Sequence, residues 1–168
     1  MTTQIALQDP IAMANLVINL SKKYNYSITN LQLQKILFFV QGFSLKNYQQ
    51  PIMDTQFVKW TYGPAIKDVY RSFKYNGSAP IISDQPNAYF DNNGKFCLEH
   101  ITVQNLTTLQ LKQLKNLISK LLPIPVWKLF NLIKNDSSYV KESEIEQNYT
   151  NTEIVDLYQK LITKFNLN

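Results

Sequence analysis

The chain has 168 residues, of which 45% are hydrophobic, 12% aromatic and only 17% charged, a composition typical of a folded domain rather than a disordered segment. A chain of this length usually builds one hydrophobic core, so we predict a single compact domain over residues 1–168. No apolar run reaches the roughly 18 residues that cross a bilayer, and the first ten residues do not resemble a signal peptide. We therefore expect a cytoplasmic protein with no membrane partner.

Cys97 and His100 are the only cysteine and histidine, so neither an intrachain disulfide nor a Cys/His metal shell is expected. If both lie on one strand, their odd separation sends them to opposite faces, which argues against a nucleophile and base pair. We expect a buried thiol and a surface histidine. The four glycines fit no phosphate-binding loop. The sequence therefore predicts no metal, no cofactor and no enzymatic activity.

The net charge of +5 is unevenly distributed along the chain. Residues 1–80 carry eight basic and three acidic side chains, whereas residues 81–168 carry nine of each. A positive half can attract nucleic acid or an acidic protein, although a solvated surface is the commoner explanation. Arg71 is the only arginine, which disfavours sequence-specific DNA recognition and leaves at most weak DNA binding.

Two helices are predicted near the N-terminus. Asp9 before Pro10 is a capping pattern, and apolar residues recur at helical spacing to about Lys23. Thr29 with Gln32 forms a capping-box pattern at the start of a second helix. Apolar residues surround that helix rather than forming a stripe, so we expect it to be the buried central element.

The stretch "QFVKWTYGPAIKDVYRSF" is interpreted as a strand-to-helix corner. Apolar residues alternate over residues 57–62, as expected for a strand. Gly63 then frees the backbone, and Pro64 is expected to form the first turn of a helix over residues 64–76. That helix ends near Gly77, and Tyr70 shares a face of it with Ile66 and Phe73. Trp60 and Tyr70 either pack in the joint between strand and helix or serve as exposed aromatic anchors for a partner.

The remaining chain is predicted to contain a hairpin and a C-terminal helical half over residues 107–168. Two apolar arms flank the turn in "AYFDNNGKFCL", as in a β-hairpin. Further helices should begin near Thr107, at Pro125 and near Thr150. The predicted fold class is α+β and predominantly α-helical, with about six helices and a small strand or hairpin element.

Two groups of charged residues are candidates for a functional site. Glu142, Glu144 and Glu146 alternate and could raise a carboxyl pKa by crowding, but in a polar loop water relieves that crowding. Lys67, Arg71 and Lys74 lie along one flank of the helix predicted over residues 64–76, together with tyrosines. They could hold phosphates and stack bases, or they could form the solvated face of an amphipathic helix.

"ITNLQLQKILFFVQGFSL" and "PIMDTQFVKWTYGPAIKDVYRSFKYNGSAPI" resemble the signature of the Panacea-domain family, the SocA-like antitoxins and related phage-associated proteins. The resemblance covers about residues 10–82. Its first element fits Leu31, Leu33, Gln34, Lys35, Leu37, Gln41 and Gly42, and its second fits Trp60, Tyr62, Gly63, Pro64, Val69, Tyr70 and Phe73. The second half is looser, because Asn135 and Asp136 replace a Thr-His pair that the family often carries, so a role that needs this histidine does not carry over.

The resemblance implies an antitoxin module that binds and neutralises a protein toxin, with relatives that act as proteolytic adaptors and so involve a protease or chaperone. It implies no reaction. The candidate partner-binding residues are Lys35, Gln41, Trp60, Tyr62, Lys67, Tyr70, Arg71 and Tyr75, and the candidate structural residues are Gln34, Gly42, Gly63 and Pro64. Gln34, Lys35 and Gln41 either hydrogen-bond within the fold or contact the partner. The alternative function is a weak nucleic-acid-binding regulator that uses the basic flank of the helix over residues 64–76.

Overall fold

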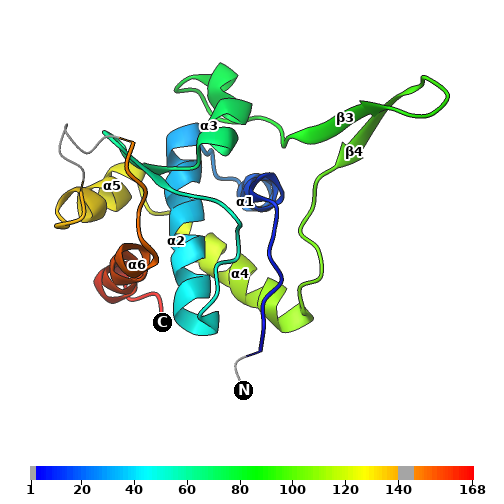
Figure 1. The fold of residues 1–168 in the computed structure, drawn as a ribbon. Coiled ribbons are helices and arrows are strands. Elements are labelled where there is room, and N and C mark those ends of the chain that lie inside the picture. The colour runs from blue at the N-terminus through cyan, green and yellow to red at the C-terminus, as the bar shows by residue number, and fades with distance from the viewer. Residues whose placement is uncertain (1–2, 140–145) are drawn as a thin grey trace.

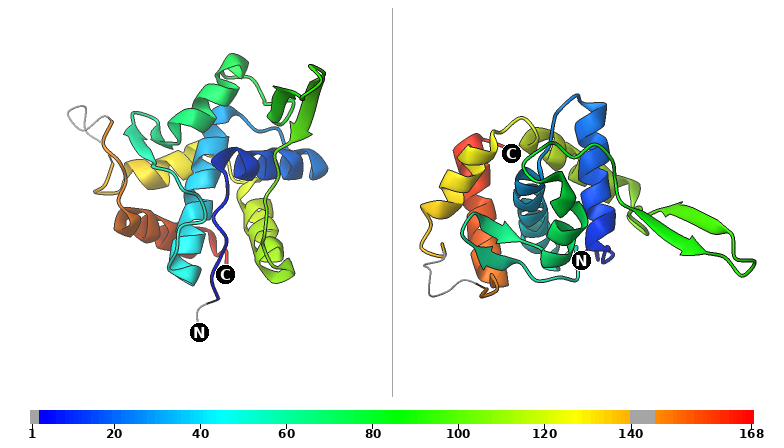
Figure 2. Two further views of the ribbon diagram at one scale, coloured as in Figure 1. Left: turned by 45° about the vertical axis from the view of Figure 1, so that its right-hand side comes forward. Right: turned by 90° about the horizontal axis from the view of Figure 1, so that it is seen from above.

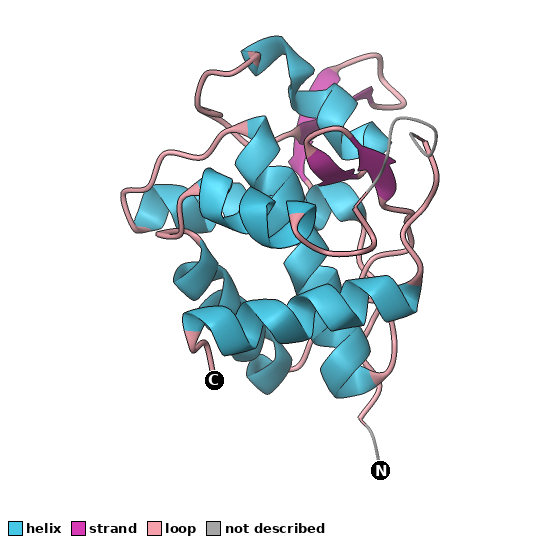
Figure 3. Ribbon diagram, turned by 90° about the vertical axis from the view of Figure 1, so that its left-hand side faces the viewer, coloured by secondary structure: helices cyan, strands magenta, loops and turns pink. Residues whose placement is uncertain are grey.

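The computed structural model of the chain describes residues 3–139 and 146–168. Within these residues it contains six α-helices, a short 3-10 turn and two separate two-stranded antiparallel sheets (Figure 3). The elements are α1 (Pro10–Lys23), α2 (Asn30–Tyr48), β1 (Val58–Trp60), β2 (Gly63–Ala65), α3 (Lys67–Phe73), η1 (Lys74–Asn76), β3 (Pro86–Phe90), β4 (Phe96–His100), α4 (Thr108–Leu121), α5 (Val126–Lys134) and α6 (Asn151–Phe165). The predicted mainly helical α+β fold is confirmed.

Helix α2 is the centre of the fold, as its sequence predicts. The other helices and the β1–β2 hairpin surround it (Figures 1 and 2). Residues on every side of α2 are buried, and those from Leu33 to Val40 are at most 1% exposed. Phe38 packs edge-to-face against Phe57 and Tyr149, which come from distant parts of the chain. The core therefore forms around the helix with the least amphipathic sequence.

The helix caps agree with the sequence in all but one detail. Asp9 accepts a hydrogen bond from the backbone N–H of Ile11, and capping boxes begin α4 and α6 at Thr107 and Thr150. At α2 only half of the predicted box forms. Thr29 accepts from the backbone N–H of Gln32, but the Gln32 side chain donates to the carbonyl of Leu122 instead. A tertiary contact thus replaces the local one.

The predicted corner at Gly63 and Pro64 is wrong in form, because the chain makes a second β-hairpin there before α3 begins at Lys67. Pro64 lies in β2 opposite Lys59 and not in a helix. Lys59 directs its backbone N–H and C=O to the segment 146–147, away from β2. The position opposite Lys59 therefore requires no N–H donor, and a proline is tolerated in this strand.

The predicted hairpin is present as β3 and β4, and it projects away from the helical body (Figures 1 and 2). Cys97 and His100 lie on opposite faces of it, as expected. His100 is exposed, as expected, but the expectation that the Cys97 thiol is buried is wrong. Cys97 is half-buried, because β4 lies outside the core.

Over the described parts of the chain, no helix is both long enough and apolar enough to cross a membrane.

Candidate functional site

Gln34 and Lys35, adjacent on α2, hold the end of the β1–β2 hairpin and the start of α3. The Gln34 side chain accepts a hydrogen bond from the backbone N–H of Ile66 at 2.9 Å and donates to the side chain of Asn30 at 2.9 Å. Asn30 in turn donates to the carbonyl of Tyr70 at 3.0 Å. These bonds satisfy buried backbone groups at both ends of the first turns of α3.

Lys35 is an uncommon group to find inside a protein, with 1% of its surface exposed. Its Nζ donates to the carbonyl oxygen of Pro64 at 3.2 Å, and no carboxylate of the described residues lies within ion-pair distance. Burial in this apolar setting lowers the pKa of Lys35 from 10.5 to about 7. The ammonium therefore deprotonates close to neutral pH.

Gln41 and Gly42 act further along α2. Gln41 accepts hydrogen bonds from the backbone N–H groups of Ile52 and Met53 and donates to the carbonyl of Met53. A Cβ at Gly42 would lie 2.5 Å from the Cβ of Tyr158, so glycine here lets α2 and α6 approach closely. Both residues hold neighbouring segments against α2.

Lys35 and Gln41 must therefore be corrected as candidate contacts with a binding partner. They are 1% and 3% exposed and lie inside the molecule. Of the two alternatives for Gln34, Lys35 and Gln41, hydrogen bonding within the fold is the one the structure shows. Polar residues on a helix that is apolar all round are the signal that could have decided this, because a buried polar group needs an internal partner.

Trp60 and Tyr70 form the centre of an exposed surface built by β1 and α3. Their rings meet edge-to-face with centroids 5.1 Å apart, and Tyr70 is 40% exposed. Trp60 also donates its indole N–H to Glu146 at 3.0 Å. We call the set Trp60, Tyr62, Lys67, Tyr70, Arg71 and Tyr75 the β1–α3 surface. Of the two alternatives for Tyr70, burial in the core and exposure as an aromatic anchor, the structure excludes full burial, because the ring packs on Trp60 at the rim of the fold.

The charged residues of the β1–α3 surface face a hollow of about 460 Å³ between α3 and the segment 146–148. Lys67 forms an ion pair with Glu146, and Arg71 forms one with Asp68 at 3.3 Å. Hydrogen bonds from Lys67 and Trp60 hold the pKa of Glu146 below its ordinary value. Glu146 therefore belongs to this site, although its sequence context predicts only a polar loop. Glu142 and Glu144, its partners in the predicted carboxylate group, lie outside the described residues.

Tyr62 and Tyr75 are the most exposed members of the surface, at 66% and 68%. Tyr62 lies in the β1–β2 turn, with its ring 6.4 Å from that of Phe130 on α5. The same turn is held by Tyr139, whose hydroxyl donates to the carbonyl of Thr61 at 2.7 Å. Tyr75 lies on η1, which follows α3. The surface therefore includes one exposed tyrosine in the β1–β2 turn and another in the turn that follows α3.

Asp136, the second residue of the Asn135–Asp136 pair singled out in the sequence, has a structural role. Its side chain is 7% exposed and accepts hydrogen bonds from the backbone and hydroxyl of Ser138, at 2.9 and 2.6 Å. It also forms an ion pair with Lys160 of α6. Burial alone would raise the pKa of Asp136, but the bonds from Lys160 and Ser138 outweigh this and lower it. The pair joins the end of α5 to α6.

We expect Gly63→Ala to lower the free energy of unfolding by about 2 kcal/mol. Gly63 has a φ of 93°, and an added Cβ would lie 3.0 Å from Cε of the buried Lys35. Gly94→Ala is a matched control, since its φ is 75° but nothing lies within 4 Å of the added Cβ. Urea unfolding of the two variants measures the difference. Equal losses would mean that Lys35 does not restrict this position.

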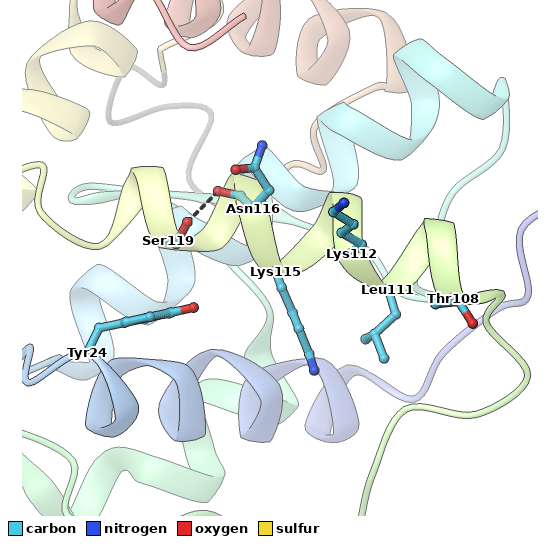
Figure 4. Close-up of a pocket in the computed structure, with 7 residues that line it drawn as sticks. All are labelled: Tyr24, Thr108, Leu111, Lys112, Lys115, Asn116 and Ser119. Carbon is cyan, nitrogen blue, oxygen red and sulfur yellow. Dashed lines mark hydrogen bonds between the residues drawn. The ribbon is translucent and has the colours of Figure 1, made fainter.

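A further hollow of about 380 Å³ lies between the end of α1 and the side of α4 (Figure 4). Tyr24 and Lys115 extend into the space between the two helices, and Lys112 lies one turn away along α4. This hollow contains none of the predicted site residues. Among the described residues, no group of three or more His, Cys, Asp or Glu side chains is placed to hold a metal ion.

These features define a mainly helical α+β domain with a buried polar network and an exposed aromatic surface. A family model described as "Antitoxin SocA-like, Panacea domain" matches residues 33–166. The chain therefore belongs to the SocA-like Panacea-domain family, and the resemblance seen in the sequence is confirmed. A relative named Antitoxin SocA, from Caulobacter vibrioides (strain NA1000 / CB15N), is 37% identical over 75 residues, which cover 45% of this chain and 40% of that relative. No solved structure matches the chain.

Proposed function

We propose that this protein is a non-enzymatic antitoxin-like module, bacterial or prophage-encoded, that binds a cognate toxin and neutralises it through the β1–α3 surface. Membership of an antitoxin family supports this proposal, as does the relative whose name is Antitoxin SocA. The observation that carries it is the exposure of Tyr62, Tyr70 and Tyr75 around the Trp60–Tyr70 pair.

The residue types of the β1–α3 surface suit protein recognition. Tyrosine, tryptophan and arginine contribute most of the binding energy at protein interfaces, because they combine a large contact area with a polar group. Arg71 has 66% of its side chain exposed, and its ion pair with Asp68 lies at the surface. Such a pair contributes little to stability, so Arg71 is available to a binding partner.

The mode of action that we propose is masking of the toxin, followed by its delivery to a protease or chaperone. The chain would need no cofactor for either. The start of α3 is held rigidly against α2. Gln34 accepts a hydrogen bond from the backbone N–H of Ile66, just before α3, and Lys35 donates one to the carbonyl of Pro64 in β2. A preorganised surface loses less conformational freedom on binding.

The nucleic-acid alternative loses the charge on which it was based. The helix predicted over residues 64–76 begins only at Lys67, and Lys67 forms an ion pair with Glu146. Arg71 is exposed and can exchange Asp68 for another partner, but the neighbouring carboxylates reduce the positive potential of the helix. So few free positive charges release too few counterions to give useful affinity for a phosphate backbone. We expect at most weak nucleic-acid binding.

The test is to replace Arg71 and Tyr75 with alanine. We expect both variants to keep the unfolding temperature of the unaltered protein, because both side chains are exposed. We expect each to weaken toxin binding by about 1 to 2 kcal/mol, or roughly 5- to 30-fold. Co-expression with the product of the neighbouring reading frame, scored by growth, and titration of the two purified proteins measure this.

Tyr24→Ala is the matched control, since Tyr24 is 43% exposed but lies at the end of α1, outside the β1–α3 surface. It should leave neutralisation unchanged. Full rescue of growth by the Arg71→Ala, Tyr75→Ala double variant would show that the toxin binds elsewhere. Failure of the unaltered protein to bind the neighbouring gene product would instead count against the antitoxin function with that product.

A further inference from the structure

The hollow between the end of α1 and the side of α4 has the size of a small-molecule site (Figure 4). Its volume is about 380 Å³, within the roughly 300 to 1,000 Å³ that is typical of ligand pockets. Tyr24, which follows the last residue of α1, borders it on one side. On the other side its lining comes from α4 residues spaced like neighbours on a helix surface: Thr108, Leu111, Lys112, Lys115, Asn116 and Ser119.

The two chain segments that border the hollow carry only positive charge. Residues 10–24 and 108–122 contain no Asp or Glu, although the whole chain has 12. Lys112 and Lys115 are exposed, and neither forms an ion pair with a carboxylate of the described residues. Two further lysines lie in the last turn of α1. This hollow is therefore more positive than the β1–α3 surface, where carboxylates lie beside the basic residues.

The spacing of Lys112 and Lys115 favours a ligand with more than one negative charge. The two residues are three apart on α4, so their side chains are neighbours on the helix surface, and like charges at this spacing repel each other. An anion between the two ammonium groups removes that repulsion. Lysine binds phosphate as a point charge on a flexible stem, so each ammonium can contact a different phosphate of one ligand.

Tyr24 adds an aromatic surface to this positive charge. Its side chain is 43% exposed and extends into the space between α1 and α4 (Figure 4). Nζ of Lys23 lies over the ring, 5.6 Å from its centroid. Exposed aromatic rings next to basic groups are surfaces on which nucleobases stack. The side chain of Leu111 adds an apolar contact to the same lining.

We propose that this hollow binds a nucleoside di- or triphosphate, with its phosphates on Lys112 and Lys115 and its base on Tyr24. No carboxylate lines the hollow, so it offers neither a ligand for Mg²⁺ nor a general base, and the nucleotide is bound without being hydrolysed. A nucleic-acid strand needs a longer track of positive charge than two lysines provide. The hollow shares no residue with the β1–α3 surface, so the proposal is independent of toxin binding.

Calorimetric titration of the full chain with ADP, without Mg²⁺ and at physiological ionic strength, tests the proposal. We expect saturable binding of a single ADP. The double variant Lys112→Gln, Lys115→Gln should weaken this binding at least tenfold. The double variant Lys46→Gln, Lys95→Gln removes the same charge from exposed positions outside the hollow, and it should leave the affinity unchanged. Because all four lysines are exposed, both variants should keep the unfolding temperature of the unaltered protein.

Titration with pyrophosphate separates the contribution of the base from that of the phosphates. Tyr24→Ala should weaken ADP binding by about fivefold or more and leave pyrophosphate binding unchanged. Tyr24→Phe keeps the ring and should bind ADP like the unaltered protein. Excess Mg²⁺ should weaken ADP binding, because the cation neutralises the phosphates and the hollow has no carboxylate to hold it.

Three results would overturn the proposal. The first is the absence of ADP binding at millimolar concentration, or an equal loss of affinity in the two double lysine variants. The second is an ADP affinity that Tyr24→Ala does not change, which would leave a site for phosphate alone. The third is tighter binding of a single-stranded oligonucleotide than of ADP, abolished by Lys112→Gln, Lys115→Gln, which would assign the hollow to nucleic acid.

Discussion

Replacing Gly42 with alanine is expected to lower the free energy of unfolding by about 3 kcal/mol or more. In an ordinary helix the same change stabilises by about 1 kcal/mol, because alanine has the higher helix propensity. Here the new methyl group would lie 2.5 Å from Cβ of Tyr158 and 3.2 Å from the carbonyl oxygen of Ile154. Neither atom can move without shifting α6, so the clash outweighs the propensity.

Urea unfolding measures this effect, and two further variants identify its cause. Lys46→Ala, at an exposed position of α2, should change stability by less than about 0.5 kcal/mol. Tyr158→Ala should not rescue Gly42→Ala, because the clashing Cβ remains. Tyr158→Gly removes that atom and should show a favourable coupling with Gly42→Ala of about 1 kcal/mol or more. A stable Gly42→Ala protein would show that α2 and α6 do not approach this closely.

The helices could be predicted from the sequence because their signals are local. Asp9, Thr107 and Thr150 each place a side-chain oxygen beside the first free N–H groups of a helix, and each does so in the structure. The box at Thr29 failed only where the Gln32 side chain found the carbonyl of Leu122. That competitor is distant in sequence, so no local pattern reports it.

Pro64 shows where local reasoning is insufficient. A proline after glycine can begin the first turn of a helix, and it can equally well occupy a strand position that needs no N–H donor. The backbone N–H and C=O of Lys59 bind the segment 146–147, nearly ninety residues further along the chain. The strand position opposite Lys59 therefore needs no N–H donor, and Pro64 fits there. The strand partner was therefore invisible in the stretch itself.

In the candidate site, too, some residues could be placed from the sequence and others could not. The exposed aromatic residues and Arg71 could be named from their types and spacing, and the structure leaves Tyr62, Tyr75 and Arg71 at the surface. Their role as contacts with a toxin stays a prediction. Lys35 and Gln41 could not be placed correctly, because their partners are backbone groups of segments that pack on α2 only in the folded state.

The titration of the buried Lys35 is expected to raise the free energy of unfolding as pH increases. In the folded protein its pKa is about 7, whereas in the unfolded chain it is close to the ordinary value of 10.5. Between these values the unfolded chain binds more protons than the folded one, so the free energy of unfolding increases as pH rises. Below about pH 7 both states are protonated, and the cost of burying the ammonium is fully present.

We therefore expect the contribution of Lys35 to increase by on the order of 3 to 5 kcal/mol between pH 7 and pH 10, since each pH unit is worth about 1.4 kcal/mol. Lys35→Met keeps the length of the side chain and removes the titrating group, so its stability should lack this rise. Lys46→Met, on the exposed side of α2, should retain the slope of the unaltered protein. Urea unfolding of the three proteins at each pH measures the slopes. Parallel slopes for Lys35→Met and the unaltered protein would mean that the ammonium stays protonated inside the fold, and that the carbonyl of Pro64 alone stabilises its charge.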